Sequence, residues 1–393
     1  MREIKKYLVI LYMFLCPAEI ALNIIFKSTT KYVGMLVLGA WLATIIYEDR
    51  DGRTNISKQV ISTFIWLIYC LVSLAWGTES SYTTEYITTY LQMGLLLFIC
   101  TSETWNQHES EIFIQVYLYG SIMTAVAMNF FGGNEFSGRG TIEILGKYCD
   151  SNQVAANIVP AVLISYYKAF KENEYLQKRV FYIAVFLFTT YAVLMTSSRG
   201  GLVAIIIGIA VITTIQIRGH QLAIGQFLPI IAIAVITLQF LPLSTRQRLF
   251  NFSSYTDEYA YGGSRLTLWA YLFDDFDAQW LIGHGVGSTI PCFISKLGYE
   301  SGVHNTFLLV LYEVGFVGFA FFIYPYISMI VYHYLHKNVI PCVLIIAAMV
   351  SSFFLDALNL RYLWNALIIG VVLYNIDDNG KVNNMCKAHK YLK

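Results

Sequence analysis

Hydrophobic residues lie along this chain in long runs rather than in the amphipathic stripes of a soluble fold. Most runs hold about 17–25 residues, enough as α-helix to cross about 30 Å of hydrocarbon. A polar-rich run at 84–100 is the weakest, and Pro325 is expected to kink the tenth. The pattern predicts an all-α polytopic membrane protein, a single integral membrane domain over 1–393, with twelve spans at 7–26, 32–47, 59–76, 84–100, 112–131, 152–170, 180–196, 201–217, 222–241, 305–332, 338–355 and 362–376.

Composition supports this class. The chain is 57% hydrophobic and 13% charged, whereas a soluble protein carries about 25% charged residues. The formal net charge of +1 says nothing about partners, because charge in such a chain is sorted by side of the membrane. From the long apolar runs we expect the lipid bilayer, and no nucleic acid, as a partner. The N-terminal MREIKK precedes an apolar run without a small-residue cleavage site, which favours a retained first span over a signal peptide.

The distribution of basic residues predicts the orientation. With the N-terminus inside, 16 of the 26 Lys and Arg residues fall in inner segments, so both termini are expected to be cytoplasmic. The inner segments hold eleven lysines and five arginines, and the outer segments four lysines and six arginines. Arginine matches phosphate oxygens with a planar fork, so this bias suggests an outer anionic ligand; lipid-anchoring arginines are the alternative. The longest outer segment, 242–304, is expected to be an ordered loop that bears part of an active site.

The segment 196–201 (TSSRGG) separates two apolar runs that are together too long for one span. Its glycines permit a turn, which would place Arg199 just before a helix that starts on the outer side. Orphan N–H groups at a helix N-terminus attract anions. Arg199 is therefore a candidate anion ligand, with a snorkelling interface cation as the alternative.

Arg265 and Trp269 lie four residues apart in the outer segment and share one face if this stretch is helical. A guanidinium beside an aromatic ring suits a sugar-phosphate ligand; an amphipathic helix among lipid headgroups is an equal alternative. The stretch 283–287 (GHGVG) resembles a dinucleotide fingerprint only superficially, because no strand precedes it. We expect Gly285 and the neighbouring glycines to let the loop bend close to a ligand or to another helix.

Acidic and cysteine residues in the outer segments permit two further interpretations. The run 274–277 (DDFD) has the spacing of a divalent-cation site, although a solvated helix end is the favoured interpretation. Cys149 and Cys292 are both predicted to be outside, where a disulfide between them is an open alternative. No CxxC pair is present, and we expect no metal site.

His304 and Asn305 lie at the outer mouth of the tenth span. Histidine accepts a proton near neutral pH and binds phosphate when charged, so His304 is a candidate general base or phosphate ligand. Glu313 is nine residues further on, about half a turn around the helix. It is expected to face away from His304 and to pair with another helix.

Two more outer turns supply polar candidates. The segment 150–152 (DSN) begins the sixth span, where it is first of all a helix N-cap. Asp356 and Arg361 bracket the last outer turn, which predicts a local salt bridge between them. Asn152 and Arg361 are also kept as candidate substrate-binding residues.

The order of SSRGG, GSRLTLW, GxGxG and HNTFLLVLYEVGFVG along the chain resembles the O-antigen ligase and polymerase family of bacterial inner membranes. DSNQVAAN at 150–157 is similar to that family's Asp-Pro-Asn segment, with Ser151 where proline is usual. The resemblance covers residues 150–320. It implies a GT-C-like helical glycosyltransferase that takes an undecaprenyl-diphosphate-linked glycan donor at the outer face and a glycan acceptor. Transfer would invert the anomeric carbon without a metal or other cofactor.

The resemblance also implies roles for individual residues. Arg199 and Arg265 would bind the diphosphate. His304 would deprotonate the acceptor hydroxyl or steady the phosphate, which makes these three the candidate catalytic residues. The substrate-binding candidates are Asn305, Asn152, Trp269, Arg361 and Gly285.

The favoured function is a polymerase that joins lipid-linked repeat units into O-antigen or capsular polysaccharide, with a chain-length regulator as a candidate partner. The first alternative is a ligase that transfers the glycan to lipid A-core. A protein O-oligosaccharyltransferase usually carries a sizeable C-terminal soluble part, whereas 377–393 is a short basic tail. A secondary transporter would need broken helices near the midplane and two matching halves, and the two halves of this sequence differ.

Overall fold

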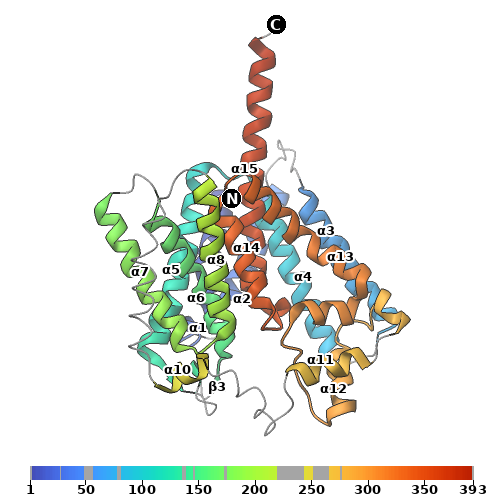
Figure 1. The fold of residues 1–393 in the computed structure, drawn as a ribbon. Helices are drawn as coiled ribbons and strands as arrows, with labels where there is room; N and C mark the ends of the chain where they lie inside the picture. The colour runs from blue at the N-terminus through green and yellow to red at the C-terminus, as the bar shows by residue number, and fades with distance from the viewer. Residues whose placement is uncertain are drawn as a thin grey trace.

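The computed structural model describes residues 2–26, 28–47, 56–77, 81–134, 139–144, 147–171, 175–218, 243–250, 265–274 and 277–391. Long helices packed side by side form most of this part of the chain (Figure 1). Both chain termini lie toward one end of the bundle, and α10 (Leu243–Phe250), α11 (Arg265–Asp274) and α12 (Thr289–Leu297) lie toward the other. The long helices are α1 (Arg2–Leu22), α2 (Thr29–Tyr47), α3 (Lys58–Val72), α4 (Ser81–Ser102), α5 (Gln107–Phe131), α6 (Ser151–Ala169), α7 (Leu176–Met195), α8 (Arg199–Arg218), α13 (Thr306–Leu335), α14 (Val339–Ser352) and α15 (Arg361–Tyr391).

These helices confirm an all-α polytopic membrane protein. Eleven of the predicted spans each overlap one of the long helices, and the span predicted at 222–241 lies outside the described residues. Six described helices are long and apolar enough to cross a membrane by length and composition: α2, α3 extended to Ala75, α5, α7, α8 and α13. The total of twelve spans stays a prediction.

Side-chain burial separates the interior of the bundle from a surface suited to lipid. One buried cluster gathers residues of α1, α3, α4, α13 and α15, and a second gathers residues of α5, α6, α7, α8 and α14. Large apolar side chains such as Met35, Ile68 and Ile206 are more than half exposed on the helix surfaces. Hydrocarbon, unlike water, carries no penalty for such exposure, so these faces fit a bilayer.

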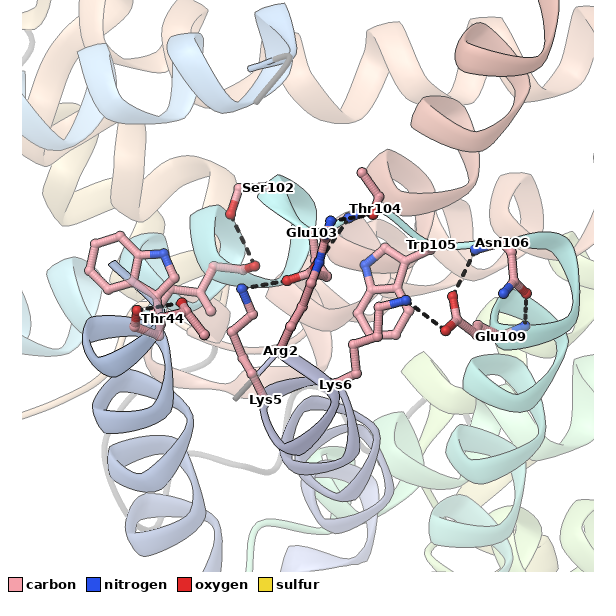
Figure 2. Close-up of polar contacts among 12 residues, drawn as sticks. Arg2, Lys5, Lys6, Thr44, Ser102, Glu103, Thr104, Trp105, Asn106 and Glu109 are labelled. Atoms are coloured by element: carbon pink, nitrogen blue, oxygen red, sulfur yellow. Dashed lines mark hydrogen bonds and ion pairs between the residues drawn. The ribbon is translucent and has the colours of Figure 1, made fainter. Parts of the chain in front are cut away.

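Ion pairs fix the first helix to the turn between α4 and α5 (Figure 2). Glu103 in that turn accepts a hydrogen bond from Arg2 and forms an ion pair with Lys5. Lys6 forms an ion pair with Glu109 at 2.6 Å. Three basic residues of the predicted cytoplasmic end are thus held by carboxylates. Burial opposes ionisation of Glu103, but Lys5 and Arg2 outweigh it and lower the pKa of this carboxyl group.

A small antiparallel sheet, which the hydrophobic pattern did not predict, precedes α6. Its strands are β1 (Gly132–Asn134), β2 (Gly140–Ile144) and β3 (Lys147–Tyr148), in the order β1-β2-β3, with Gly132 opposite Ile142. The Cys149 N–H donates to the Ile142 carbonyl at 3.0 Å, which ties the start of α6 to the sheet. Cys149 and Cys292 are not joined by a disulfide, so that interpretation is wrong.

Helix α13 is interrupted at Gly315, where φ is 64° and ψ is −174°. The sequence predicted a kink at Pro325 instead, but the non-helical backbone lies ten residues earlier, at a glycine that tolerates positive φ. The segment that contains His284 and Gly285 packs at the break: the N–H groups of these two residues donate to the carbonyls of Tyr312 and Glu313 at 3.0 and 2.8 Å. This segment is therefore anchored to α13 through backbone hydrogen bonds.

Candidate active site

The turn between α14 and α15 organises the polar end of the bundle. It contains a 3-10 helix, η6 (Ala357–Asn359). The Thr306 hydroxyl donates to the Leu355 carbonyl at 2.6 Å and accepts from the Ala357 N–H at 2.7 Å. The first residue of α13 is thereby fixed to this turn, which brings the segments before α13 and after α14 together.

Asp356 in this turn holds the backbone that carries His304 and Asn305. The Asn305 N–H donates to Asp356 Oδ1 at 3.2 Å, and the carboxyl group also accepts from the backbone of Val303 and His304. Asn305 is the N-cap of α13, since its side chain accepts from the N–H groups of Phe307 and Leu308. Asp356 and Asn305 thus fix the entry to the helix from both sides.

His304 itself has a strained backbone, with φ at 53°. Non-glycine residues seldom adopt this conformation, and they persist in it only where the surroundings impose it. His304 is half-buried, and its charged form would interact favourably with Asp356. Burial raises the pKa of Asp356, while His304 and the three backbone N–H groups act in the opposite direction.

Gly302 makes this arrangement sterically feasible. A methyl group on Gly302 would lie 2.5 Å from Asp356 Oδ2 and 3.6 Å from His304 Cε1. The carboxylate and the imidazole therefore flank one glycine, and any side chain there would displace the carboxylate.

The TSSRGG segment forms the expected turn between α7 and α8, with Arg199 as the first residue of α8. Ser198 caps the helix by accepting from the Gly201 N–H at 3.1 Å. The same hydroxyl donates to Asn152 Oδ1 at 2.7 Å. Asn152 lies in the first turn of α6, which Asp150 caps as predicted. Asn152 therefore holds the N-terminus of α8 in place. Ser197, like His304, has a positive φ, at 55°.

Arg265 and Trp269 lie on α11, which confirms a helix at this position. The Trp269 indole N–H donates to the Val303 carbonyl at 2.9 Å, one residue before His304. The Arg265 guanidinium lies 5.9 Å from the centroid of the Phe354 ring. Helix α11 therefore contacts both the His304 turn, through Trp269, and the turn after α14, through Arg265.

Phe354 connects the two arginine-bearing helices. A methyl group on Gly200 would lie 2.7 Å from the Phe354 ring, so the N-terminus of α8 packs directly against it. Arg265 lies over the same ring. Phe354 is also two residues from Asp356, which holds His304. The chain segments bearing Arg199, Arg265 and His304 therefore meet around a single turn, together with Asn152, Asn305 and Trp269.

Arg361 and Gly285 lie outside this group. Arg361 forms an ion pair with Glu19 of α1, so the predicted local salt bridge with Asp356 is wrong. Arg361 lines a mostly apolar cavity of about 180 Å³ between α1, α2 and α4. Gly285, with φ at 95°, packs against the backbone of Gly77. Of the two expectations for the glycine segment, close approach to neighbouring helices is the one that the geometry supports.

The remaining acidic candidates have structural partners. Glu313 accepts a hydrogen bond from the Thr289 hydroxyl at 2.9 Å and others from the backbone of Gly287 and Thr289. It therefore pairs with the start of α12, as expected. Asp277 accepts from the Gln279 N–H at 2.8 Å and caps a short 3-10 helix. The middle of the 274–277 run lies outside the described residues.

The fold and its polar end define a class: a multi-pass helical membrane protein with arginine and histidine residues gathered at one end of the bundle. Within that class, residues 184–323 match the family model described as O-antigen ligase. The match confirms the resemblance to the O-antigen ligase/polymerase family, and it includes Arg199, Arg265, Trp269, His304 and Asn305. Comparison with curated proteins found no match.

Three contributors to this site were not predicted from the sequence: Phe354, Asp356 as the support of the His304 turn, and Gly302. Asp356 carried a signal, since a carboxylate in a turn predicted to be outside is a functional candidate, but its spacing from Arg361 suggested the wrong partner. Phe354 and Gly302 carried no local signal. An apolar ring and a single glycine are common in such loops, and only the fold shows what they touch.

Proposed function

We propose that this chain polymerises undecaprenyl-diphosphate-linked oligosaccharide repeat units into O-antigen or capsular polysaccharide at the outer face of the bacterial cytoplasmic membrane. The observation that carries the proposal is the meeting of the Arg199, Arg265 and His304 segments around Phe354. Two guanidinium groups suit a diphosphate leaving group, because each offers paired N–H donors to phosphate oxygens. A half-buried histidine beside a carboxylate suits proton transfer.

In the proposed reaction, the acceptor hydroxyl oxygen attacks the anomeric carbon of the donor sugar. The bond from that carbon to the diphosphate oxygen breaks, and undecaprenyl diphosphate leaves with the electron pair. Attack from the opposite side inverts the anomeric configuration. His304 takes the proton of the acceptor hydroxyl, and Asp356 stabilises the resulting imidazolium ion. Arg199 and Arg265 neutralise the charge that develops on the leaving group.

Three further residues act as positioning groups in this proposal. Asn305 and Trp269 hold the His304 turn through the N-cap and the Val303 carbonyl. Asn152 holds the N-terminus of α8, and with it Arg199, through Ser198. Gly285 and Arg361, which the resemblance left as binding candidates, have structural contacts that account for them more simply.

The proposal includes a topology. Both termini are cytoplasmic, and the segment 242–304 lies outside and bears Arg265 and Trp269. The location of both chain ends at one end of the bundle, opposite α11 and α12, is consistent with it (Figure 1). A chain-length regulator in the same membrane is the proposed partner.

The ligase activity is the second candidate, favoured by the description of the family model that matches residues 184–323. Cells that carry His304→Ala or Arg199→Ala in place of the wild-type protein separate the two. If the protein is a polymerase, single repeat units still reach the surface glycan and longer chains disappear. If it is a ligase, all surface glycan is lost and long lipid-linked chains accumulate. Unchanged glycan in both variants contradicts either function.

A further inference from the structure

A cavity of about 300 Å³ opens beside the His304 turn. Gly302, Val303 and Asp356, which hold or flank His304, form part of its wall. Its opposite wall is α4. The volume lies at the lower end of the range for small-molecule sites, which is about 300–1,000 Å³. The cavity therefore adjoins the proposed reaction centre and is large enough for a small ligand or for one end of a longer one.

Three tyrosines form a stripe along the α4 wall. Tyr82, Tyr86 and Tyr90 are spaced four residues apart, so they share one face of the helix. Their rings follow one another, with centroids 6.2 Å apart for the first pair and 6.4 Å for the second. Tyr90 is buried at the inner end of the stripe, and Tyr82 and Tyr86 are half-buried. Such a stripe offers flat apolar faces with a hydroxyl group at each edge.

The polar side chains on the other walls of the cavity are carboxylates or uncharged groups. Glu300 and Asp356 supply carboxylates, and Asn359 supplies an amide. The Glu300 carboxylate lies against the Tyr82 hydroxyl. Among the described residues that line the cavity, none is lysine or arginine, and neither Arg199 nor Arg265 contributes to it. A phosphate group would therefore meet negative charge here without a compensating cation.

Resting on the proposed function, we infer that this cavity is the acceptor subsite and that it binds an uncharged or amino sugar at the end of the acceptor glycan. A sugar ring has an apolar C–H face that packs on tyrosine and hydroxyl groups that donate to carboxylates. The acidic lining excludes a phosphorylated or uronic acid sugar. The charge of each subsite thus determines which substrate it binds. The diphosphate donor binds on the side of the His304 turn that faces Arg199 and Arg265, and the acceptor sugar binds on the side that faces the tyrosines of α4.

This assignment also bears on the two candidate functions. A lipid A-core acceptor is rich in phosphate and carboxylate groups, and the acidic cavity would repel it. A growing neutral glycan would meet no such penalty. The charge of the cavity therefore favours the polymerase.

The test is the steady-state kinetics of the full-length protein in liposomes, with donor and acceptor concentrations varied separately. Tyr86→Ala and Glu300→Gln should each raise the acceptor KM about tenfold and leave the donor KM within about twofold. Tyr86→Phe keeps the ring and should raise the acceptor KM less than Tyr86→Ala does. Glu300 is exposed, so its substitution keeps the test informative if Tyr86→Ala fails to fold. Tyr119→Ala on α5, 49% exposed and far along the chain from the cavity, is the matched control.

The outcomes separate this inference from the proposed function. If the wild-type protein transfers glycan but these variants change the donor KM and not the acceptor KM, the acceptor assignment is wrong and the proposed function stands. If the wild-type protein transfers no glycan, the proposed function itself is wrong, and the acceptor assignment that rests on it is wrong as well. A second readout needs no activity: saturation-transfer NMR with lipid-free oligosaccharide released from the host polysaccharide should show contact with the wild type and lose it in Tyr86→Ala. Equal signals from both proteins overturn the inference, as does a uronic acid or phosphorylated sugar at the accepting end of that glycan.

Discussion

Replacing Gly302 by alanine tests whether the carboxylate of Asp356 positions His304. The added methyl group would lie 2.5 Å from Asp356 Oδ2, whereas ordinary contacts begin near 3.4 Å. The carboxylate must therefore move by roughly 0.5–0.9 Å to restore an ordinary contact with the methyl group. Overpacking of this kind costs about 1–3 kcal/mol.

The larger effect should be on catalysis. Asp356 Oδ1 holds the Asn305 N–H, so a displaced carboxylate pulls on the turn that carries His304. A misplacement of about 1 Å can cost about a hundredfold in rate. We expect Gly302→Ala to lower kcat by about 10- to 100-fold, with the donor KM little changed because neither arginine segment is touched.

The assay is glycan extension by purified protein in liposomes, with the melting temperature of each variant measured in parallel. Gly39→Ala is the matched control, because a methyl group there meets nothing within 4 Å. It should keep full activity and gain up to about 1 kcal/mol of helix stability. Full activity of Gly302→Ala at normal stability would refute the idea that Asp356 positions the histidine.

Three other contacts in the structure lead to further predictions. Arg265→Lys should lower transfer at least tenfold, because the planar fork is lost; Arg218→Lys, which also loses a guanidinium over an aromatic ring, should change it less than twofold in the same assay. Arg361→Ala should lower stability by about 1.5–3 kcal/mol, because it removes a charged hydrogen bond to Glu19. Its melting temperature should fall while activity per folded molecule survives, and the reverse pattern would contradict a structural role. The pKa of Glu103 lies below its ordinary value of 4.5, so its ion pairs stabilise the protein above that pH and are lost as pH falls through the lowered pKa. Melting temperature should thus fall more steeply below pH 4.5 in the wild type than in Glu103→Gln, and parallel curves would count against these pairs.

The sequence alone predicted those helices that are specified by local features, namely hydrophobic runs and helix caps. Asp150 caps a helix where the sequence predicted an N-cap. Helix α13 begins directly after Asn305, at the start of the predicted tenth span. The four-residue spacing of Arg265 and Trp269 correctly indicated a helix. These features depend on neighbours within a few residues, which a single sequence displays.

Features that depend on distant parts of the chain could not be predicted. Asp356 lies five residues from Arg361, which suggested a local pair, yet the fold brings it to Asn305 and takes Arg361 to Glu19. The helix break at Gly315 depends on its contact with residues 284 and 285, which no pattern in the neighbouring sequence displays. The sequence around Phe354 does not indicate that α8 and α11 both pack against its ring.

The central claim is that His304, supported by Asp356 and flanked by two arginine-bearing helices, transfers glycan from a lipid diphosphate. Its most direct test is the purified protein in liposomes, supplied only with the lipid-linked repeat unit and analysed for product length by gel electrophoresis and mass spectrometry. We expect products of two or more repeats with release of undecaprenyl diphosphate from the wild type, and none from folded His304→Ala. Equal product from both proteins would contradict it.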